Sequence, residues 1–107
     1  MSSLNLSDST RPSIGRGFRL QWEPAQNAHV LLYPEGMVKL NMAAGEILKR
    51  CTGELTLGEI VIDLERAFAR TGLQDDVTGF LGIAHEKGWV DWEEGDVSNV
   101  SDGRWES

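Results

Sequence analysis

The sequence predicts an α+β fold in which a three-stranded antiparallel meander is followed by a three-helix bundle. Two observations support this prediction. Residues 18–40 contain three β-rich stretches joined by connections that are too short for parallel strands. Residues 41–88 contain three stretches in which apolar residues recur at helical spacing. Strands at one end of a chain and helices at the other are typical of an α+β domain.

The three predicted strands occupy the first half of the domain. Phe18–Glu23 alternates apolar and polar residues, as a half-buried strand does. Pro24–Asn27 contains turn residues, and the apolar stretch Ala28–Tyr33 that follows is typical of a central strand. Pro34–Gly36 supplies a second turn before the short strand Met37–Leu40. The first and third strands are therefore the expected edges of the sheet.

Capping signals and apolar periodicity define the first two helices. Asn41 is the expected N-cap of the first helix, and Gly53 its end. Thr56 and Glu59 form a capping box at the start of the second helix, which keeps its helical phase until Gly72. The apolar positions are Ala44, Ile47, Leu48 and Cys51 in the first helix and Leu57, Ile60, Val61, Leu64 and Phe68 in the second.

The third helix completes the bundle. Asp75 or Asp76 is its expected N-cap, and Gly88 is its expected end. Residues 89–92 are expected to form either a short final strand or an apolar clasp. Helices two and three, joined by a short Gly-containing link, suit a helix-turn-helix pair. The order of elements therefore favours a winged-helix-like architecture.

Composition divides the chain into three parts. Residues 1–15 and 93–107 are polar and poor in large apolar side chains, so we expect a flexible N-terminal segment and a flexible acidic tail. Residues 16–92 form the expected packed domain. The net charge is −7, and residues 18–92 carry seven Lys or Arg against eleven Asp or Glu. This balance argues against a nucleic-acid ligand, which requires clustered basic residues.

The sequence also lacks signals for membranes and secretion. No apolar run approaches the length that a membrane span requires. The N-terminus has no apolar stretch of the kind found in a signal peptide. We therefore expect a cytoplasmic protein that does not associate with a membrane.

No group of residues forms a recognisable catalytic, metal or cofactor site. His29 and His85 are the only histidines, and neither has a Cys or a second His at ligand spacing. The single cysteine, Cys51, is in phase with the apolar face of the first helix and is interpreted as a small buried hydrophobe rather than a reactive thiol. Trp22 is on the apolar face of the first strand and is expected in the core. We expect no enzymatic activity and no cofactor.

Residues 31–64 carry a pattern that resembles the PqqD family. The pattern consists of LLYPEG at 31–36, LN at 40–41, A-x-EIL at 44–48 with a Cys three residues on, and G-x-x-T-x-x-EI at 53–60. The resemblance extends from about residue 16 to residue 90. It implies a winged-helix-like, non-catalytic domain of pyrroloquinoline quinone (PQQ) biosynthesis, of the class called RiPP recognition elements. One departure is His29, where the family often has a bulkier aromatic residue.

The resemblance also implies partners. Members of the family bind the ribosomally made precursor peptide PqqA and present it to the radical SAM enzyme PqqE. Two alternatives are a winged-helix DNA-binding regulator and a recognition element for a different modified peptide. The third helix disfavours the regulator, because it offers only Lys87 against Asp75, Asp76 and Glu86. An exposed edge strand would also permit a homodimer.

The expected peptide site is the groove between the third strand and the third helix. An edge strand has unpaired backbone groups that accept a peptide as an added strand, and the family analogy selects Met37–Leu40. A proline at Val38 is expected to weaken peptide binding, provided that the Val38 amide points to the free edge. The residues expected to contact the peptide are Met37, Val38, Lys39 and Leu40 on the strand and Val77, Phe80, Leu81, Ala84, His85 and Lys87 on the helix.

Overall fold

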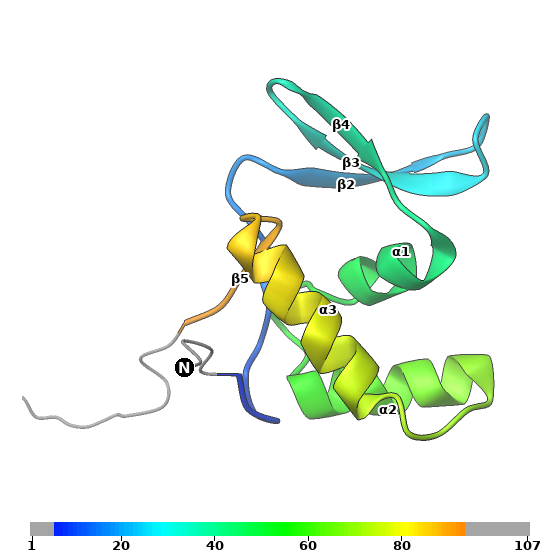
Figure 1. The fold of residues 1–107 in the computed structure, drawn as a ribbon, viewed down its shortest axis with the longest axis vertical. Helices are drawn as coiled ribbons and strands as arrows, with labels where there is room; N and C mark the ends of the chain where they lie inside the picture. Colours follow the sequence, from blue (N-terminus) through cyan, green and yellow to red (C-terminus); the bar gives the residue numbers. More distant parts are fainter. Residues whose placement is uncertain (1–5, 94–107) are drawn as a thin grey trace, which may run out of the picture.

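The computed structural model describes residues 6–93 of the chain. It confirms an α+β fold in which a three-stranded antiparallel sheet precedes three helices (Figure 1). The predictions for residues 1–5 and 94–107 lie outside the described residues. The elements in chain order are β1 (Ser13–Ile14), β2 (Arg19–Glu23), β3 (Ala28–Tyr33), β4 (Gly36–Lys39), α1 (Met42–Lys49), α2 (Leu57–Phe68), α3 (Gln74–Glu86) and β5 (Val90–Asp91).

The main sheet is the predicted meander, with strand order β2–β3–β4. Its register places Leu31 of β3 opposite Leu20 of β2 and Val38 of β4. Because side chains of directly paired residues lie on the same face, these three form one apolar row. All three pack with the helices in a single hydrophobic core. The sheet is therefore half-buried, as its alternating pattern predicts.

The capping signals of the first two helices are confirmed. The Asn41 side chain accepts a hydrogen bond from the Ala44 amide at 2.7 Å. At the start of α2, Thr56 Oγ1 accepts from the Glu59 amide, and Glu59 Oε1 accepts from the Thr56 amide. These bonds satisfy backbone groups that have no partner within the helix. Both starts are thus fixed by local sequence.

The predicted C-terminal end of α2 and the predicted start of α3 are wrong. Helix α2 ends at Phe68 rather than near Gly72, because Ala69 adopts a left-handed conformation (φ 55°). Helix α3 begins at Gln74 after Leu73, with no side-chain cap. The Leu73 amide instead donates to the carboxylate of Glu65 on α2 at 3.0 Å. A contact between two helices has replaced the local cap, and local sequence does not encode such a contact.

The N-terminal segment joins the packed unit ahead of the boundary predicted at residue 16. Strand β1 pairs antiparallel with β5, which confirms a short final strand after α3. Upstream, the carbonyls of Asp8 and Thr10 accept hydrogen bonds from the Gly58 and Leu57 amides in the first turn of α2. The Thr10 side chain is buried there. These bonds satisfy amides that a helix leaves free at its start.

Trp22 is not in the core as predicted, since 48% of its surface is exposed. It lies near the end of β2 opposite His29, and the two rings meet edge to face with their centroids 5.0 Å apart. His29 in turn packs against Gly45 of α1, where an added Cβ would come within 2.9 Å of the imidazole Nδ1. The departure at His29 is therefore accommodated by a glycine on the facing helix.

Candidate functional site

Strand β4 is an edge of the main sheet, and its outward backbone groups can be identified. It pairs with β3, and the Leu40 amide donates to the carbonyl of His29 at 3.0 Å. Hydrogen-bonded and non-hydrogen-bonded positions alternate along an antiparallel pair. Val38 therefore exchanges its backbone bonds with β3, whereas Met37 and Lys39 direct their N–H and C=O groups to the free edge. The condition attached to the Val38 proline prediction is not met, because that amide points inward.

The side chains of residues 37–40 alternate between the core and the outer face of the sheet. Val38 is half-buried and Leu40 is buried, both against the core. Met37 is 50% exposed and Lys39 is exposed, on the outer face of the sheet. The edge thus offers backbone groups from one pair of residues and an apolar side-chain row from the other.

Helix α3, which carries the other half of the expected site, lies below the sheet in Figure 1. Val77, Leu81 and Ala84 are buried in the core, so they support this helix from within. Phe80 is half-buried against the same core. Ile83, which sequence reasoning missed, is 55% exposed. Phe80 and Ile83 are therefore the large apolar side chains that α3 leaves at least partly accessible.

His85 and Lys87 lie in a separate aromatic group at the C-terminal end of α3. The His85 ring stacks on Trp92 with centroids 4.2 Å apart, and its Nε2 is 3.7 Å from an Asp91 carboxylate oxygen. The Lys87 ammonium lies 5.8 Å from the centre of the Trp89 ring. These two predicted contact residues are engaged with the segment that carries β5.

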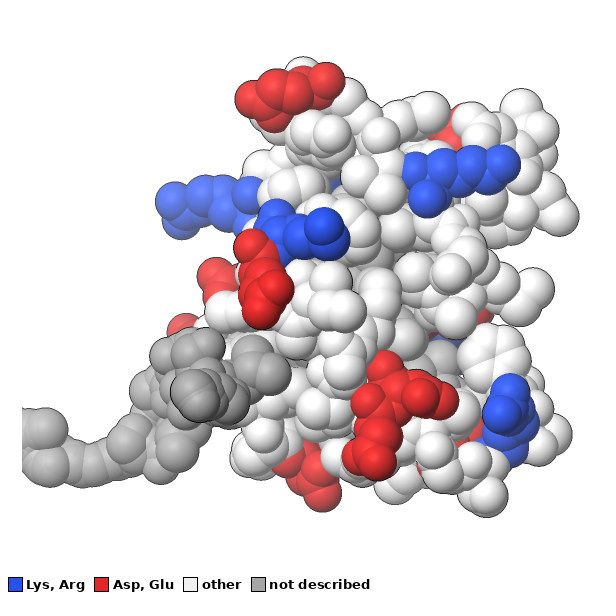
Figure 2. All heavy atoms as spheres, viewed as in Figure 1, with Lys and Arg blue, Asp and Glu red and all other residues white. Residues whose placement is uncertain are grey.

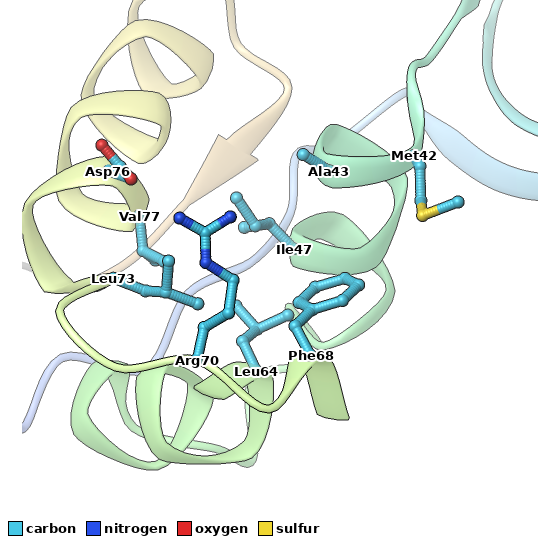
Figure 3. A pocket seen from close by; sticks show the side chains of 9 residues that line it. All are labelled: Met42, Ala43, Ile47, Leu64, Phe68, Arg70, Leu73, Asp76 and Val77. Carbon is cyan, nitrogen blue, oxygen red and sulfur yellow. The ribbon is translucent and has the colours of Figure 1, made fainter. Parts of the chain in front are cut away.

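An apolar pocket of 420 Å³ opens where the start of α1, the end of α2 and the start of α3 meet (Figure 3). Of its lining, only Val77 belongs to the predicted site. Three of the others, Ile47, Leu64 and Phe68, look like ordinary core positions in the sequence because they recur at helical spacing. The lining residues are Met42, Ala43, Ile47, Leu64, Phe68, Arg70, Leu73, Asp76 and Val77.

An ion-pair network fixes two walls of this pocket against each other. Arg50, just after α1, donates through Nε to Asp63 of α2 at 2.6 Å and through Nη1 to Glu46 of α1 at 2.8 Å. The hydrogen bond and charge of Arg50 lower the pKa of both carboxyl groups. The same two partners raise the pKa of the Arg50 guanidinium against the opposing effect of its burial. Charge-assisted bonds of this kind hold α1 on α2.

The single cysteine and the acidic and histidine side chains are the candidate reactive or metal-binding groups within the described residues. Cys51 is buried, its thiol donates to the Ile47 carbonyl, and burial raises its pKa to about 12. It is thus the buried hydrophobe predicted, since the thiolate is the reactive form. Within residues 6–93, no three His, Cys, Asp or Glu side chains gather as a metal site. In the same range, no helix has the length and apolar character needed to cross a bilayer.

The face that carries β4 and α3 has side chains of both charges. Figure 2 shows Lys and Arg side chains interleaved with Asp and Glu on the face that carries β4 and α3, with largely uncharged surface between them. A nucleic-acid interface needs a continuous basic surface, which this face of the described residues does not present. The arrangement suits a peptide that brings backbone groups and apolar side chains.

Comparisons with known proteins agree on one family. Residues 28–90 match the family described as Coenzyme PQQ synthesis protein D (PqqD). The chain is 49% identical over 92 residues to a protein of Stutzerimonas stutzeri strain A1501 named PqqA binding protein, covering 85% of this chain and 98% of that one. It is 51% identical over 81 residues to a protein of the same name from Pseudomonas aeruginosa strain UCBPP-PA14, covering 75% and 88%.

A solved structure has the same fold. The solution NMR structure of the PqqD part of Methylobacterium extorquens PqqCD, described as a functional and stand-alone RiPP recognition element, superposes with a TM-score of 0.66 at 28% identity. The match covers 80% of this chain and 94% of that one. With the sheet, the helices and the sequence in agreement, the chain belongs to the PqqD family.

Proposed function

We propose that this protein binds a PqqA-like precursor peptide in extended form and presents it to a PqqE-like radical SAM enzyme, without turnover of its own. The observation that carries the proposal is the free edge of β4, where the backbone groups of Met37 and Lys39 face outward. An edge of this kind binds a peptide through main-chain hydrogen bonds.

Three further facts support the proposal. Relatives close to half identical along most of their length are named PqqA binding proteins. The structural relative is described as a recognition element that functions alone. Val38 and Phe80 are both partly buried against the same core, so each leaves apolar surface for the alternate side chains of an added strand. Such a role belongs in the cytoplasm, where ribosomal peptides are made.

A titration tests the binding step. Labelled protein is mixed with a synthetic PqqA-like peptide, and the backbone amide shifts are followed by NMR. We expect the largest changes at 36–41 and at 76–84, with saturation at a one-to-one ratio. Shifts that avoid both segments would contradict the groove. Competition with a precursor peptide from an unrelated pathway separates PqqA recognition from recognition of another modified peptide.

The presentation step needs its own test. Affinity of a PqqE-like enzyme for the labelled peptide is measured with and without this protein. We expect the peptide to join a three-component assembly more tightly than it joins the enzyme alone. Equal affinity in both mixtures would remove presentation from the proposal and leave binding intact. A concentration series in size-exclusion chromatography shows in the same samples whether the free β4 edge also pairs two copies of the chain.

A further inference from the structure

We propose that the 420 Å³ pocket between α1, α2 and α3 receives one large apolar side chain of the bound peptide and so contributes to its recognition. The inference rests on the proposed function, because it takes the peptide strand on β4 as given. It adds a subsite that lies beyond the β4 strand.

The position of the pocket is the first argument. The ladder that begins in β4 continues to Leu40, whose amide bonds to His29, and Asn41 then caps α1. The next two residues, Met42 and Ala43, line the pocket. A strand advances about 3.3 Å per residue, so a peptide on the β4 edge reaches Met42 about three residues after it passes Lys39.

Helix α3 also contributes residues to the pocket. On α3, Asp76 and Val77 line the pocket, and Phe80 lies one helical turn further along the same face. Residues that follow β4 in the chain and residues at the start of α3 thus both line the pocket. A peptide that follows the groove is brought to its mouth.

The lining determines the kind of side chain. Its interior is formed by apolar side chains of the three helices, among them Ile47, Leu64 and Phe68. Because most of the lining is apolar, an apolar side chain placed there removes the most apolar surface from water. Figure 3 shows Arg70 extending into the pocket from the loop after α2, with Asp76 at its rim. Neither makes an ion pair with another described residue. Both charged groups can therefore interact with polar backbone groups of the bound peptide.

The exposure of Met42 supports an open site. It is 75% exposed, the largest value among the exposed large apolar side chains of residues 6–93. A flexible thioether beside an apolar pocket adapts to occupants of different shape. Burial of Met42 by an incoming side chain would add to the apolar area that binding removes from water.

The test uses a variant that narrows the mouth without disturbing the core. Ala43 lines the pocket but is itself exposed in the first turn of α1, so Ala43→Met has room outside the core. Ala67→Met is the matched control, since Ala67 is exposed on α2 and is not part of the lining. Thermal melts establish that both variants fold. If Ala43→Met does not fold, Ala43→Glu takes its place, because a carboxylate suits the first turn of a helix.

Each variant is titrated with a synthetic PqqA-like peptide and with versions in which each large apolar residue is replaced in turn by Ala. With the wild-type protein and with Ala67→Met, we expect one replacement to weaken binding on the order of tenfold or more, the effect of withdrawing one buried side chain. With Ala43→Met, the intact peptide binds about as weakly as that replaced peptide, and the same replacement has little further effect.

Equal affinity of Ala43→Met and Ala67→Met for every peptide would contradict the proposed role of the pocket in peptide binding. If the wild-type protein binds the peptide with shifts at β4 in that case, the proposed function stands and only the pocket is lost. If the wild-type protein does not bind the peptide, the proposed function and the pocket are both wrong.

Discussion

Neighbouring residues on β4 have amides that point in opposite directions. Val38 bonds to β3, whereas Lys39 faces the free edge. Proline removes the donor at either position and is tolerated in a sheet only where that donor faces outward. Lys39→Pro should therefore keep the fold and lower peptide affinity by about two- to tenfold, the worth of one hydrogen bond. Val38→Pro should cost about 1–3 kcal/mol of folding free energy, because it removes a ladder hydrogen bond and leaves a β3 carbonyl without its partner.

Calorimetric titration with the peptide and thermal denaturation separate the two effects. The proline variants control for each other, since they share the new ring and differ in the direction of the lost amide. Unchanged affinity in Lys39→Pro would count against strand addition at β4. A fully stable Val38→Pro would show that the assigned alternation of the backbone bonds is wrong.

Two glycines in helices should respond oppositely to alanine. Ala normally stabilises a helix interior by about 0.5–1 kcal/mol over Gly. Gly79 on α3 has open space around an added Cβ, so Gly79→Ala should realise that gain. At Gly45 the Cβ would come within 2.9 Å of His29, so Gly45→Ala should be destabilising, by about 1–3 kcal/mol. Urea denaturation measures both.

A double variant tests the cause of the Gly45 effect. His29→Ala removes the ring that the new methyl group would meet, so Gly45→Ala should cost less in that background. The same loss of stability with and without His29 would place the strain elsewhere in α1. Such non-additivity is the expected mark of two residues in contact.

Between elements, the contact of α1 with α2 depends on Arg50 and therefore on pH. Glu46 and Asp63 both have lowered pKa values in the folded protein. A carboxyl group with a lowered folded-state pKa stabilises the fold above its unfolded value, and this contribution is lost as the pH falls through the lowered pKa. Arg50→Met should lower the stability at pH 7 and flatten its dependence between about pH 5 and pH 2.

Urea denaturation of the wild type and Arg50→Met across that pH range gives the comparison. Lys49→Met is a suitable control, because Lys49 makes only an exposed 3.8 Å contact with Glu46. Parallel curves for the wild type and Arg50→Met would show that the guanidinium does not set the two pKa values.

Elements were predictable where their signals are local. The capping box of α2, the Asn41 cap and the strand β2 each depend on signals within a few residues, and all three are present, although burial along β2 does not follow the period of two at Trp22. The predicted start of α3 is wrong because the Leu73 amide bonds to Glu65, eight residues away on α2, and not to a local capping side chain. Strands β1 and β5 have two residues each, too few for a periodic pattern, so the sequence gives no signal for β1 and does not distinguish a strand from an apolar clasp at β5.

The candidate site was predictable to a lesser degree. Chain order identifies β4 as an edge, but the direction of each amide follows from the observed register. Sequence periodicity groups Phe80 with Leu81, whereas the fold leaves the first half-exposed and buries the second. The pocket was not predictable, because it forms where three helices meet. Its apolar lining residues Ile47, Leu64 and Phe68 recur at helical spacing, as core residues do.

At the scale of the whole molecule, one core joins the sheet to the helices and leaves the β4 edge free. Leu31 of β3 packs in the same cluster as Leu48 of α1 and Leu81 of α3, which fixes the sheet over the helical half. The N-terminal segment adds to this unit by bonding to the first turn of α2. A rigid frame around an open edge lowers the entropic cost of binding an extended peptide.

Hydrogen exchange of the β4 amides tests the central claim most directly. Exchange rates of Met37, Val38 and Lys39 are measured by NMR without peptide and with a saturating PqqA-like peptide. We expect Val38 to be protected in both samples, and Met37 and Lys39 to become protected only when the peptide is present. Met37 and Lys39 amides that exchange equally fast in both samples, with the peptide bound, would contradict strand addition at β4.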